Sequence, residues 1–228
     1  MSRLVISVLI GLPPIAACAH EEIPQLLLIV REQVRPDSAE TYATNESEIA
    51  GACARLTCPH PYLALTPISG RTEVWWLNAF ASREDKERVD RAWASSESLM
   101  AELRPLGKRK EQLRQALRTT LTTHRPDLSA GAAWRVEGAR FFVVTVGLGD
   151  RQPEGAVFES PDGQWFVITP AATRAAADRV AAGADAGSLV LAVQPQWSFP
   201  SDDWVAADPD FWKQSPAARS RPRSRRSP

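Results

Sequence analysis

Runs of apolar residues separated by turn signals predict the strands of an antiparallel sheet. Leu26–Val30 is a continuous apolar run, which is typical of a strand buried on both faces. Tyr62–Ile68 and Thr72–Phe80 flank a Ser-Gly turn, and this arrangement predicts a hairpin. Four more strands are expected later in the chain, at Arg140–Val146, Ala156–Glu159, Gln164–Ile168 and Ser188–Val193.

Helical spacing of apolar residues appears between these strands. One helix is expected to open at Pro36, and a second to run from its cap, Ser82, to a break at Pro105 and Gly107. Residues 106–125 are then expected to form a separate basic helix that links two units. An alanine-rich helix is expected before the last strand.

The order of these elements divides the chain into six segments. The first strands and helices, with the strand from Arg140, follow the β-α-β-β-α-β order of a ferredoxin-like unit. The predicted segments are a signal peptide (1–18), a ferredoxin-like βαββα unit (24–105), a basic linker helix (106–125), a second βββαβ half-unit (138–194), an irregular aromatic and acidic extension (195–214) and a disordered arginine-rich tail (215–228).

The fold class that follows is α+β, with helices on one face of an antiparallel sheet. Because the strands are apolar at successive positions, the second face cannot stay in water. Either a partner subunit, giving a homodimer, or the second half of the same chain is expected to cover it.

Charge is unevenly distributed along the chain. The 27 basic residues balance the 27 acidic ones, but the first 17 residues hold one basic residue, the last ten hold five, and neither end holds an acid. The body is therefore acidic overall, and the charge balance alone does not decide on a nucleic-acid partner. The arginine-rich tail has the charge to bind nucleic acid, but because the N-terminus predicts export we expect no nucleic-acid partner. Residues 101–125 carry seven basic residues against two acidic ones, which fits either an anion-binding patch or a solvated helix face.

The N-terminus predicts export. Leu4–Ala17 is apolar but too short to span a bilayer, and Ile15–Cys18 resembles the bacterial lipobox, in which the Cys is lipidated. Cleavage after Ala19 for ordinary secretion is one alternative, and a buried strand at Leu4–Ile10 of a cytosolic protein is another. The expected location is the periplasm or cell envelope, with a lipid on Cys18 as the only membrane contact.

Export would leave Cys53 and Cys58 as an even pair in an oxidising compartment. A disulfide between them requires the helix to end before Cys58, since cysteines five apart in a continuous helix point to different faces. Two buried thiols are the alternative. His60 does not complete a zinc-type spacing and no nucleotide-binding motif occurs, so neither a metal nor a cofactor is expected.

The segment from Leu26 to about Leu103 resembles the dimeric α+β barrel superfamily, which includes antibiotic-biosynthesis-monooxygenase-type and NIPSNAP-type domains. The resemblance lies in the opening strand, the helix after Pro36, the hairpin from Tyr62 to Phe80 and the helix after Ser82. Members range from cofactor-independent oxygenases and haem-degrading enzymes to proteins of no assigned activity. The resemblance therefore implies a fold and leaves the activity open.

In the oxygenase members, Asn, Trp and sometimes Arg surround a cavity of the barrel, which makes Trp76, Asn78 and Arg31 the candidate catalytic residues here. With Tyr62, the same residues are the candidate ligand site, since Trp76 and Asn78 alternate onto one face of their strand. Core packing is the alternative role for the tryptophans. The leading hypothesis is an exported, membrane-anchored binding protein with an apolar cavity for a small ligand; the alternative is a cofactor-independent monooxygenase acting on an aromatic molecule.

Overall fold

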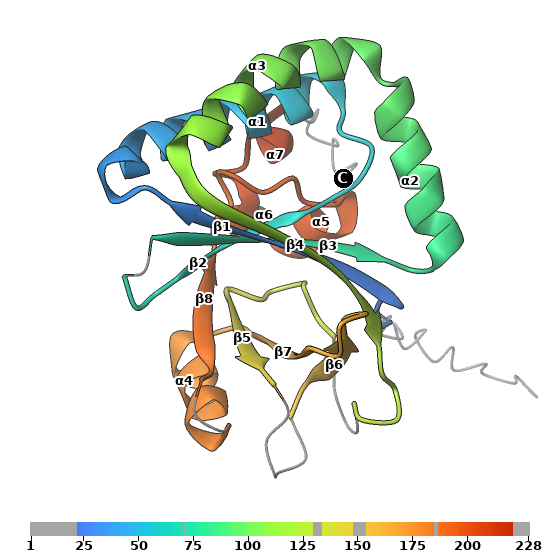
Figure 1. Ribbon diagram of the computed structural model, residues 1–228, viewed down its shortest axis with the longest axis vertical. Coiled ribbons are helices and arrows are strands. Elements are labelled where there is room, and N and C mark those ends of the chain that lie inside the picture. The colour runs from blue at the N-terminus through green and yellow to red at the C-terminus, as the bar shows by residue number, and fades with distance from the viewer. Residues whose placement is uncertain (1–21, 71, 130–133, 148–153, 185–186, 221–228) are drawn as a thin grey trace, which may run out of the picture.

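Eight antiparallel strands form a closed barrel (Figure 1). The computed structural model describes residues 22–70, 72–129, 134–147, 154–184 and 187–220. The predicted signal segment and Cys18 thus lie outside the described residues. The strands are β1 (Leu26–Val34), β2 (Leu63–Pro67), β3 (Glu73–Phe80), β4 (Arg114–His124), β5 (Phe141–Val146), β6 (Ala156–Glu159), β7 (Trp165–Ala171) and β8 (Leu189–Val193).

The two halves of the barrel repeat one strand order. Around the barrel the strands run β1-β3-β2-β8-β5-β7-β6-β4. When the strands of each half are numbered from one, both halves have the order 4-1-3-2. The halves join where β2 pairs with β8, at Leu65 and Val193, and where β4 pairs with β6, at Thr123 and Glu159. The predicted α+β class is confirmed, and the second half of the chain closes the barrel.

Helices cover the two halves unequally (Figure 1). Three helices, α1 (Ala39–Leu56), α2 (Arg83–Ser95) and α3 (Glu97–Leu113), lie over the outer face of the first half, and α1 follows a short 3-10 turn at Pro36–Ser38. In the second half α4 (Arg174–Gly183) packs on β5, β7 and β8. Only nine residues separate β5 from β6, too few for a counterpart of the 18-residue α1.

The prediction of a separate basic helix over 106–125 was wrong. Helix α3 continues through Pro105 and Gly107 to Leu113, and the chain then enters β4; the break in the helical region falls instead at Ser96. Leu113, Leu117 and Leu121 are four residues apart, a spacing that fits one face of a helix. Four residues are also two periods of a strand, so this spacing does not distinguish a helix from a strand. Four threonines in β4 and its long pairing with β1 favour the strand.

The prediction for the C-terminal segments was also wrong in part. Residues 195–214 contain α5 (Asp202–Ala207) and α6 (Pro209–Trp212), and residues 216–220 form α7 (Pro216–Ser220), which packs on α1. Trp204 and Trp212 belong to the same buried cluster as the barrel interior. These two aromatic side chains fix a segment that its proline-rich sequence suggested was irregular.

Side chains fill the inside of the barrel. The inward positions of the first half include Leu27, Ile29 and Trp75, and those of the second half include Phe142 and Phe166, all fully buried. An eight-stranded barrel leaves room inside for little more than its own side chains. Among the described residues, none of the helices is both long enough and apolar enough to cross a membrane.

Candidate functional site

Strand alternation divides β1 into an inward and an outward row. Leu27 and Ile29 point into the barrel, whereas Leu28 and Val30 point out toward the helices. Val30 pairs with Trp76 of β3 on that outer face. The outer face of β4, β1 and β3 therefore forms a floor, and α2 and α3 lie over it.

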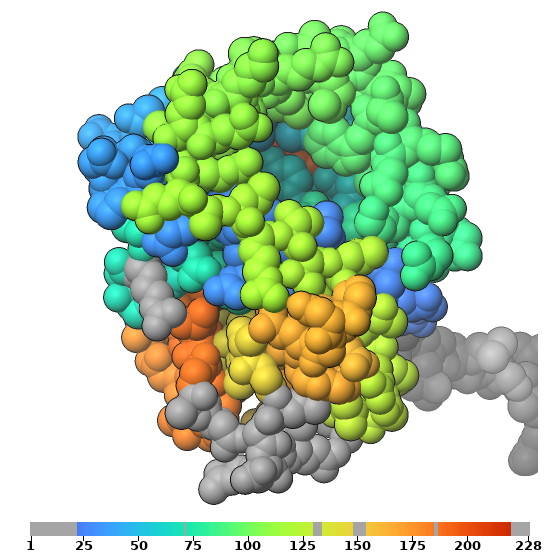
Figure 2. Space-filling view, viewed as in Figure 1, coloured from blue at the N-terminus to red at the C-terminus, as the bar shows by residue number. Residues whose placement is uncertain are grey.

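The floor is incompletely covered. Figure 2 shows a hollow between α2, α3 and β4. The outer face of β1 and β4 and the helices α2 and α3 carry five apolar side chains that are only half-buried: Leu28, Val30, Trp93, Leu103 and Leu121. Leu117, on the outer face of β4, is 48% exposed. We call this region, defined by these six residues, the outer cleft.

A buried set of charged groups lies beside the outer cleft, two positions along β1 from Val30. Lys110 of α3 bridges two carboxylates, with its Nζ 3.0 Å from Glu32 Oε2 and 3.1 Å from Glu46 Oε1. Arg114 Nη1 donates to Glu32 Oε1 at 2.7 Å, and the Tyr42 hydroxyl donates to Glu32 Oε2. We call these five residues, from β1, α1, α3 and β4, the ion cluster.

The two carboxylates of the ion cluster differ in their electrostatics. Burial raises the pKa of Glu46 to about 7, against the opposing effect of Lys110. The Lys110–Glu46 contact is an ion pair without the alignment of a hydrogen bond, so burial is poorly compensated. Burial also acts to raise the pKa of Glu32, but Lys110, Tyr42 and Arg114 outweigh it and lower that pKa. Glu46 is therefore the group that changes charge near neutral pH.

The structure brings three of the four predicted ligand-site residues to the outer face. Trp76 is 8% exposed, and Lys110 Nζ lies 4.3 Å from its ring centroid. Asn78 is half-buried two residues further along β3, opposite Leu28. The Tyr62 ring meets Trp76 edge-on with centroids 5.8 Å apart.

Arg31 is separated from the other three. It pairs across the strands with Trp75, on the inward face, and its guanidinium lies 4.3 Å from that ring centroid. Its Nη2 donates to Glu73 Oε1 at 2.9 Å. Arg31 thus ties β1 to β3 on the barrel side of the sheet and does not reach the outer cleft.

Sequence reasoning identified the basic segment as either an anion-binding patch or a solvated helix face, but it did not connect this segment with Glu32 and Glu46. Lys110 and Arg114 lie in the basic segment that was interpreted as a linker helix, and Glu32 follows the apolar run of the first strand. One signal was present, because Tyr42 and Glu46 are four residues apart and share a helix face with Cys53. An acid on the buried face of a helix requires a buried cation nearby.

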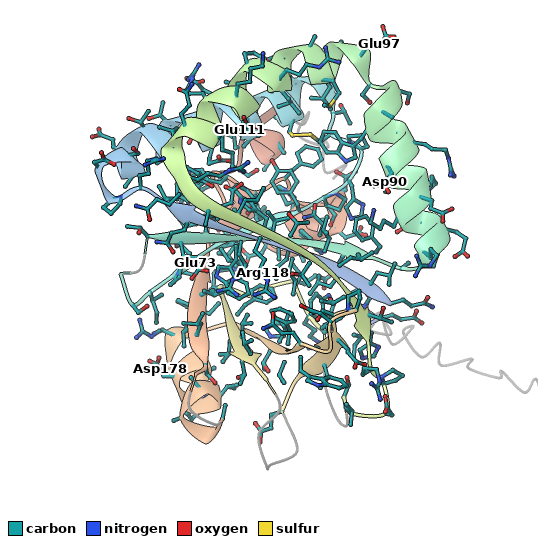
Figure 3. The ribbon with its side chains drawn as sticks, viewed as in Figure 1. Glu73, Asp90, Glu97, Glu111, Arg118 and Asp178 are labelled. Carbon is teal, nitrogen blue, oxygen red and sulfur yellow. A yellow bond between two sulfur atoms is a disulfide. The ribbon has the colours of Figure 1, made fainter. Side chains whose placement is uncertain are left out.

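A disulfide joins Cys53 and Cys58 on the helix side of the sheet (Figure 3). Helix α1 ends at Leu56, and Thr57 takes a left-handed conformation with φ 57°. This turn brings Cys58 back, so that its backbone N–H donates to the Cys53 carbonyl at 3.0 Å. Both cysteines are buried, and the Tyr62 hydroxyl contacts Cys53 Sγ at 3.7 Å. The disulfide therefore fixes the end of α1 above the Tyr62–Trp76 pair.

The described part of the chain contains no group of three or more His, Cys, Asp or Glu side chains placed to hold a metal ion. The two histidines near the sheet, His60 and His124, contact different partners and do not lie together. His60 contacts the Ala79 carbonyl at 2.8 Å and stacks on Phe80, while His124 contacts Ser129 Oγ at 3.0 Å. The ion cluster therefore supplies the charged groups beside the outer cleft, and the His60 ring lies behind Phe80.

Comparison with known proteins gives only distant likenesses. No protein family matches the chain, and no curated protein matches it in sequence. Among solved structures, a protein of Fusobacterium nucleatum assigned as a monooxygenase has 11% identity and a TM-score of 0.48, over 74% of this chain and 91% of that one. A similarly assigned protein of Lactobacillus acidophilus has 9% identity and a TM-score of 0.45, over 76% and 94%.

An anthrone oxidase-like protein has 11% identity and a TM-score of 0.45, over 77% of this chain and 93% of that one. Likenesses of this size do not assign the chain to a family. The structure itself shows the architecture, in which a single chain closes an eight-stranded α+β barrel.

Proposed function

We propose that the protein binds a small, largely apolar molecule in the outer cleft. The observation that carries this proposal is the set of half-buried apolar side chains around a hollow, with the buried ion cluster beside it. Pockets that bind small molecules are mostly apolar with a few placed polar groups. Trp76 supplies a flat ring at the floor, and Asn78 supplies an amide.

The barrel interior is a poorer candidate for this role. Its described side chains are packed against one another and buried, so a ligand would have to displace core residues such as Trp75. In the outer cleft a ligand would cover apolar surface that is already partly exposed. Each 100 Å² covered is worth about 2.5 kcal/mol before the costs of association.

Binding of the neutral dye Nile red tests the proposal. Addition of the purified protein should increase the fluorescence of the dye. The increase should saturate, with one dye molecule bound per protein. Leu121→Trp, which fills the cleft, should weaken binding about tenfold, which corresponds to about 1.4 kcal/mol. The control is Leu189→Trp on β8, half-buried but remote from the cleft. No saturable binding, or equal effects of the two substitutions, would overturn the proposal.

We further propose that the chain is exported and anchored through a lipid on Cys18. The Cys53–Cys58 disulfide supports export, because such bonds persist in oxidising compartments. The intact mass of the protein from a bacterial membrane fraction tests this: an acylated N-terminal Cys18 is expected, and an unprocessed Met1 in the cytosol contradicts it. A homodimer stays a prediction, although the barrel needs no partner for closure.

A second candidate function is oxidation of an aromatic molecule by oxygen without a cofactor. The observation that favours it is the placement of Trp76 and Asn78 on one face beside the outer cleft, where a flat ring and an amide could hold an aromatic molecule. The test is protein-dependent oxygen consumption with anthrone and no added reductant. Asn78→Ala should lower the rate at least tenfold if the amide takes part, and no consumption above a protein-free blank excludes this function for anthrone.

A further inference from the structure

We propose that the occupant of the outer cleft is an amphiphile with a carboxylate, held by Lys110 and Arg114 with its apolar chain along the floor of the cleft. This inference rests on the proposed binding function and names the chemical class of its ligand. Three features of the described residues support it: the charge of the ion cluster, the layout of the floor and the exposure of the two cations.

The ion cluster can change its charge by one unit. Lys110 and Arg114 face two acids, Glu32 and Glu46, so the cluster is neutral when both acids are ionised. When Glu46 takes up a proton, Glu32 alone remains opposite two cations. A buried net charge of +1 favours a counter-anion, since water does not screen it well.

The floor of the cleft leads away from the two cations. On the outer face of β1, Glu32 is followed by Val30 and Leu28, a distance of about 13 Å along an extended strand. On the same face of β4, Leu117 pairs with Glu32, Thr119 with Val30 and Leu121 with Leu28. The charged end and the apolar floor thus lie in one line, as the two parts of an amphiphile require.

The cations are within reach of a ligand, whereas the acids are not. The side chains of Lys110 and Arg114 are 15% and 19% exposed, and those of Glu32 and Glu46 are 3% and 1% exposed. Arg114 begins β4, directly after the last residue of α3. A carboxylate entering from the cleft therefore meets the two positive groups first, and can accept hydrogen bonds from both.

Binding should take up close to one proton at pH 8, where Glu46 of the free protein is mostly ionised, and little at pH 6. The carboxylate ligand, one proton from solvent and the ionised Glu46 combine to give the bound carboxylate and a neutral Glu46 acid, so charge is conserved. The groups that act on Glu46 are Lys110 from α3, Glu32 from β1, Asn45 and Tyr42 from its own helix and Tyr62 before β2, while Arg114 from β4 pairs with Glu32. Both tyrosines have a raised pKa and stay neutral, so they do not compete for this proton.

The sign of the pH dependence follows from Glu46. With a pKa of about 7 in the free protein, its protonated fraction falls from about nine tenths at pH 6 to about one tenth at pH 8. A ligand that requires the protonated form should bind about tenfold more weakly at pH 8. The ligand's own carboxyl is ionised at both pH values, so it adds little to this change.

The experiment compares decanoate with decanol, two chains that differ in the head group, by displacement of bound Nile red at pH 6 and pH 8. Decanoate should bind the wild type about tenfold more tightly at pH 6, and decanol equally at both pH values. Glu46→Gln, which mimics the neutral acid, should bind decanoate tightly at both. The control Glu48→Gln, on the exposed side of α1 and paired with Arg109 at 2.8 Å, should keep the wild-type pH dependence.

Lys110→Met provides a second variant, and should weaken decanoate at least tenfold without weakening decanol. Decanol binding at or above the level of decanoate at pH 6 would overturn the inference and leave the proposed function standing. A Glu46→Gln protein with the wild-type pH dependence would also overturn it. Failure of Nile red and both chains to bind would overturn the proposed function and this inference together.

Discussion

The two halves of the barrel share a strand order but differ in what lies outside them. Over the first half, α1, α2 and α3 form a layer that encloses the ion cluster and leaves the outer cleft partly open. Over the second half, α4 packs directly on the sheet, where Ala171 and Ala177 meet Val143. Small residues meet at the contact in the second half, whereas large and charged side chains fill the space between the helices and the sheet in the first.

The barrel core and the proposed ligand site are therefore built from different parts of the molecule. The strands of both halves contribute to one core inside the barrel, and each half adds smaller buried clusters beneath its own helices. The ion cluster and the outer cleft both lie in the first half, which has the additional helices. Substitutions in the shared core should therefore disturb the packing of both halves, whereas substitutions in the helix layer should disturb the ligand site of the first half.

The largest effect is expected in the shared core. Trp75→Ala from the first half and Phe166→Ala from the second each remove a fully buried aromatic ring and should each cost about 3–5 kcal/mol of unfolding free energy. Urea denaturation should show a single transition for both variants, because the core spans the two halves. Two separate transitions would mean that the halves are independent.

A smaller effect, with a defined pH dependence, is expected at Glu46. Its pKa of about 7 in the folded protein lies above the value of 4.5 expected when it is exposed, so the folded state binds the extra proton between these values. Stability from this group is present below pH 4.5 and is lost as the pH rises through 7, by about 3 kcal/mol in total.

Glu46→Gln does not titrate and should avoid that loss. The unfolding free energy of the variant, measured by urea denaturation, should rise relative to wild type by about 3 kcal/mol between pH 4.5 and pH 8. Glu48→Gln, a change of the same chemistry at an exposed position of the same helix, is the control. A difference between Glu46→Gln and wild type that stays constant with pH would contradict the expected shift.

Loss of the Cys53–Cys58 disulfide should cost somewhat less. The bond closes a short loop, and the reduced freedom of the unfolded chain is worth about 2 kcal/mol. Replacing both cysteines by alanine should lower thermal stability and make it insensitive to reducing agents. Since the disulfide lies over Tyr62 and Trp76, the same variant should also weaken Nile red binding, whereas a stability loss from Phe166→Ala should not.

Much of the fold could be predicted from the sequence because its signals are local. The apolar run from Leu26, the hairpin that ends at Phe80 and the cap at Ser82 each specify their own element, and the structure contains them all. The region around Leu117 could not be assigned in this way. Its leucine spacing fits a helix and a strand alike, and only the pairing with β1, more than 80 residues earlier, decides between them.

The candidate site was less predictable because it depends on strand register. Trp76 and Asn78 share a face by alternation within one strand. Whether Arg31 lies on that same face depends on how β1 pairs with β3. In the structure Arg31 lies opposite Trp75, and this places it inside the barrel. The ion cluster combines residues from four elements, and no local pattern in the sequence connects Glu32 with Lys110.

The smallest effect is expected for an ion pair of the second half, and it tests the comparison from the other side. Arg174 and Asp178 pair at 2.8 Å on α4, and their side chains are 55% and 50% exposed. Water and salt weaken such a pair, so Asp178→Asn should change the unfolding free energy by no more than about 0.5 kcal/mol. Lys110→Met, which leaves two buried acids without a shared cation, should cost several times more at pH 8. Urea denaturation of the two variants side by side measures this contrast. Equal losses of unfolding free energy would mean that the buried ion cluster contributes no more to stability than an exposed ion pair of the second half.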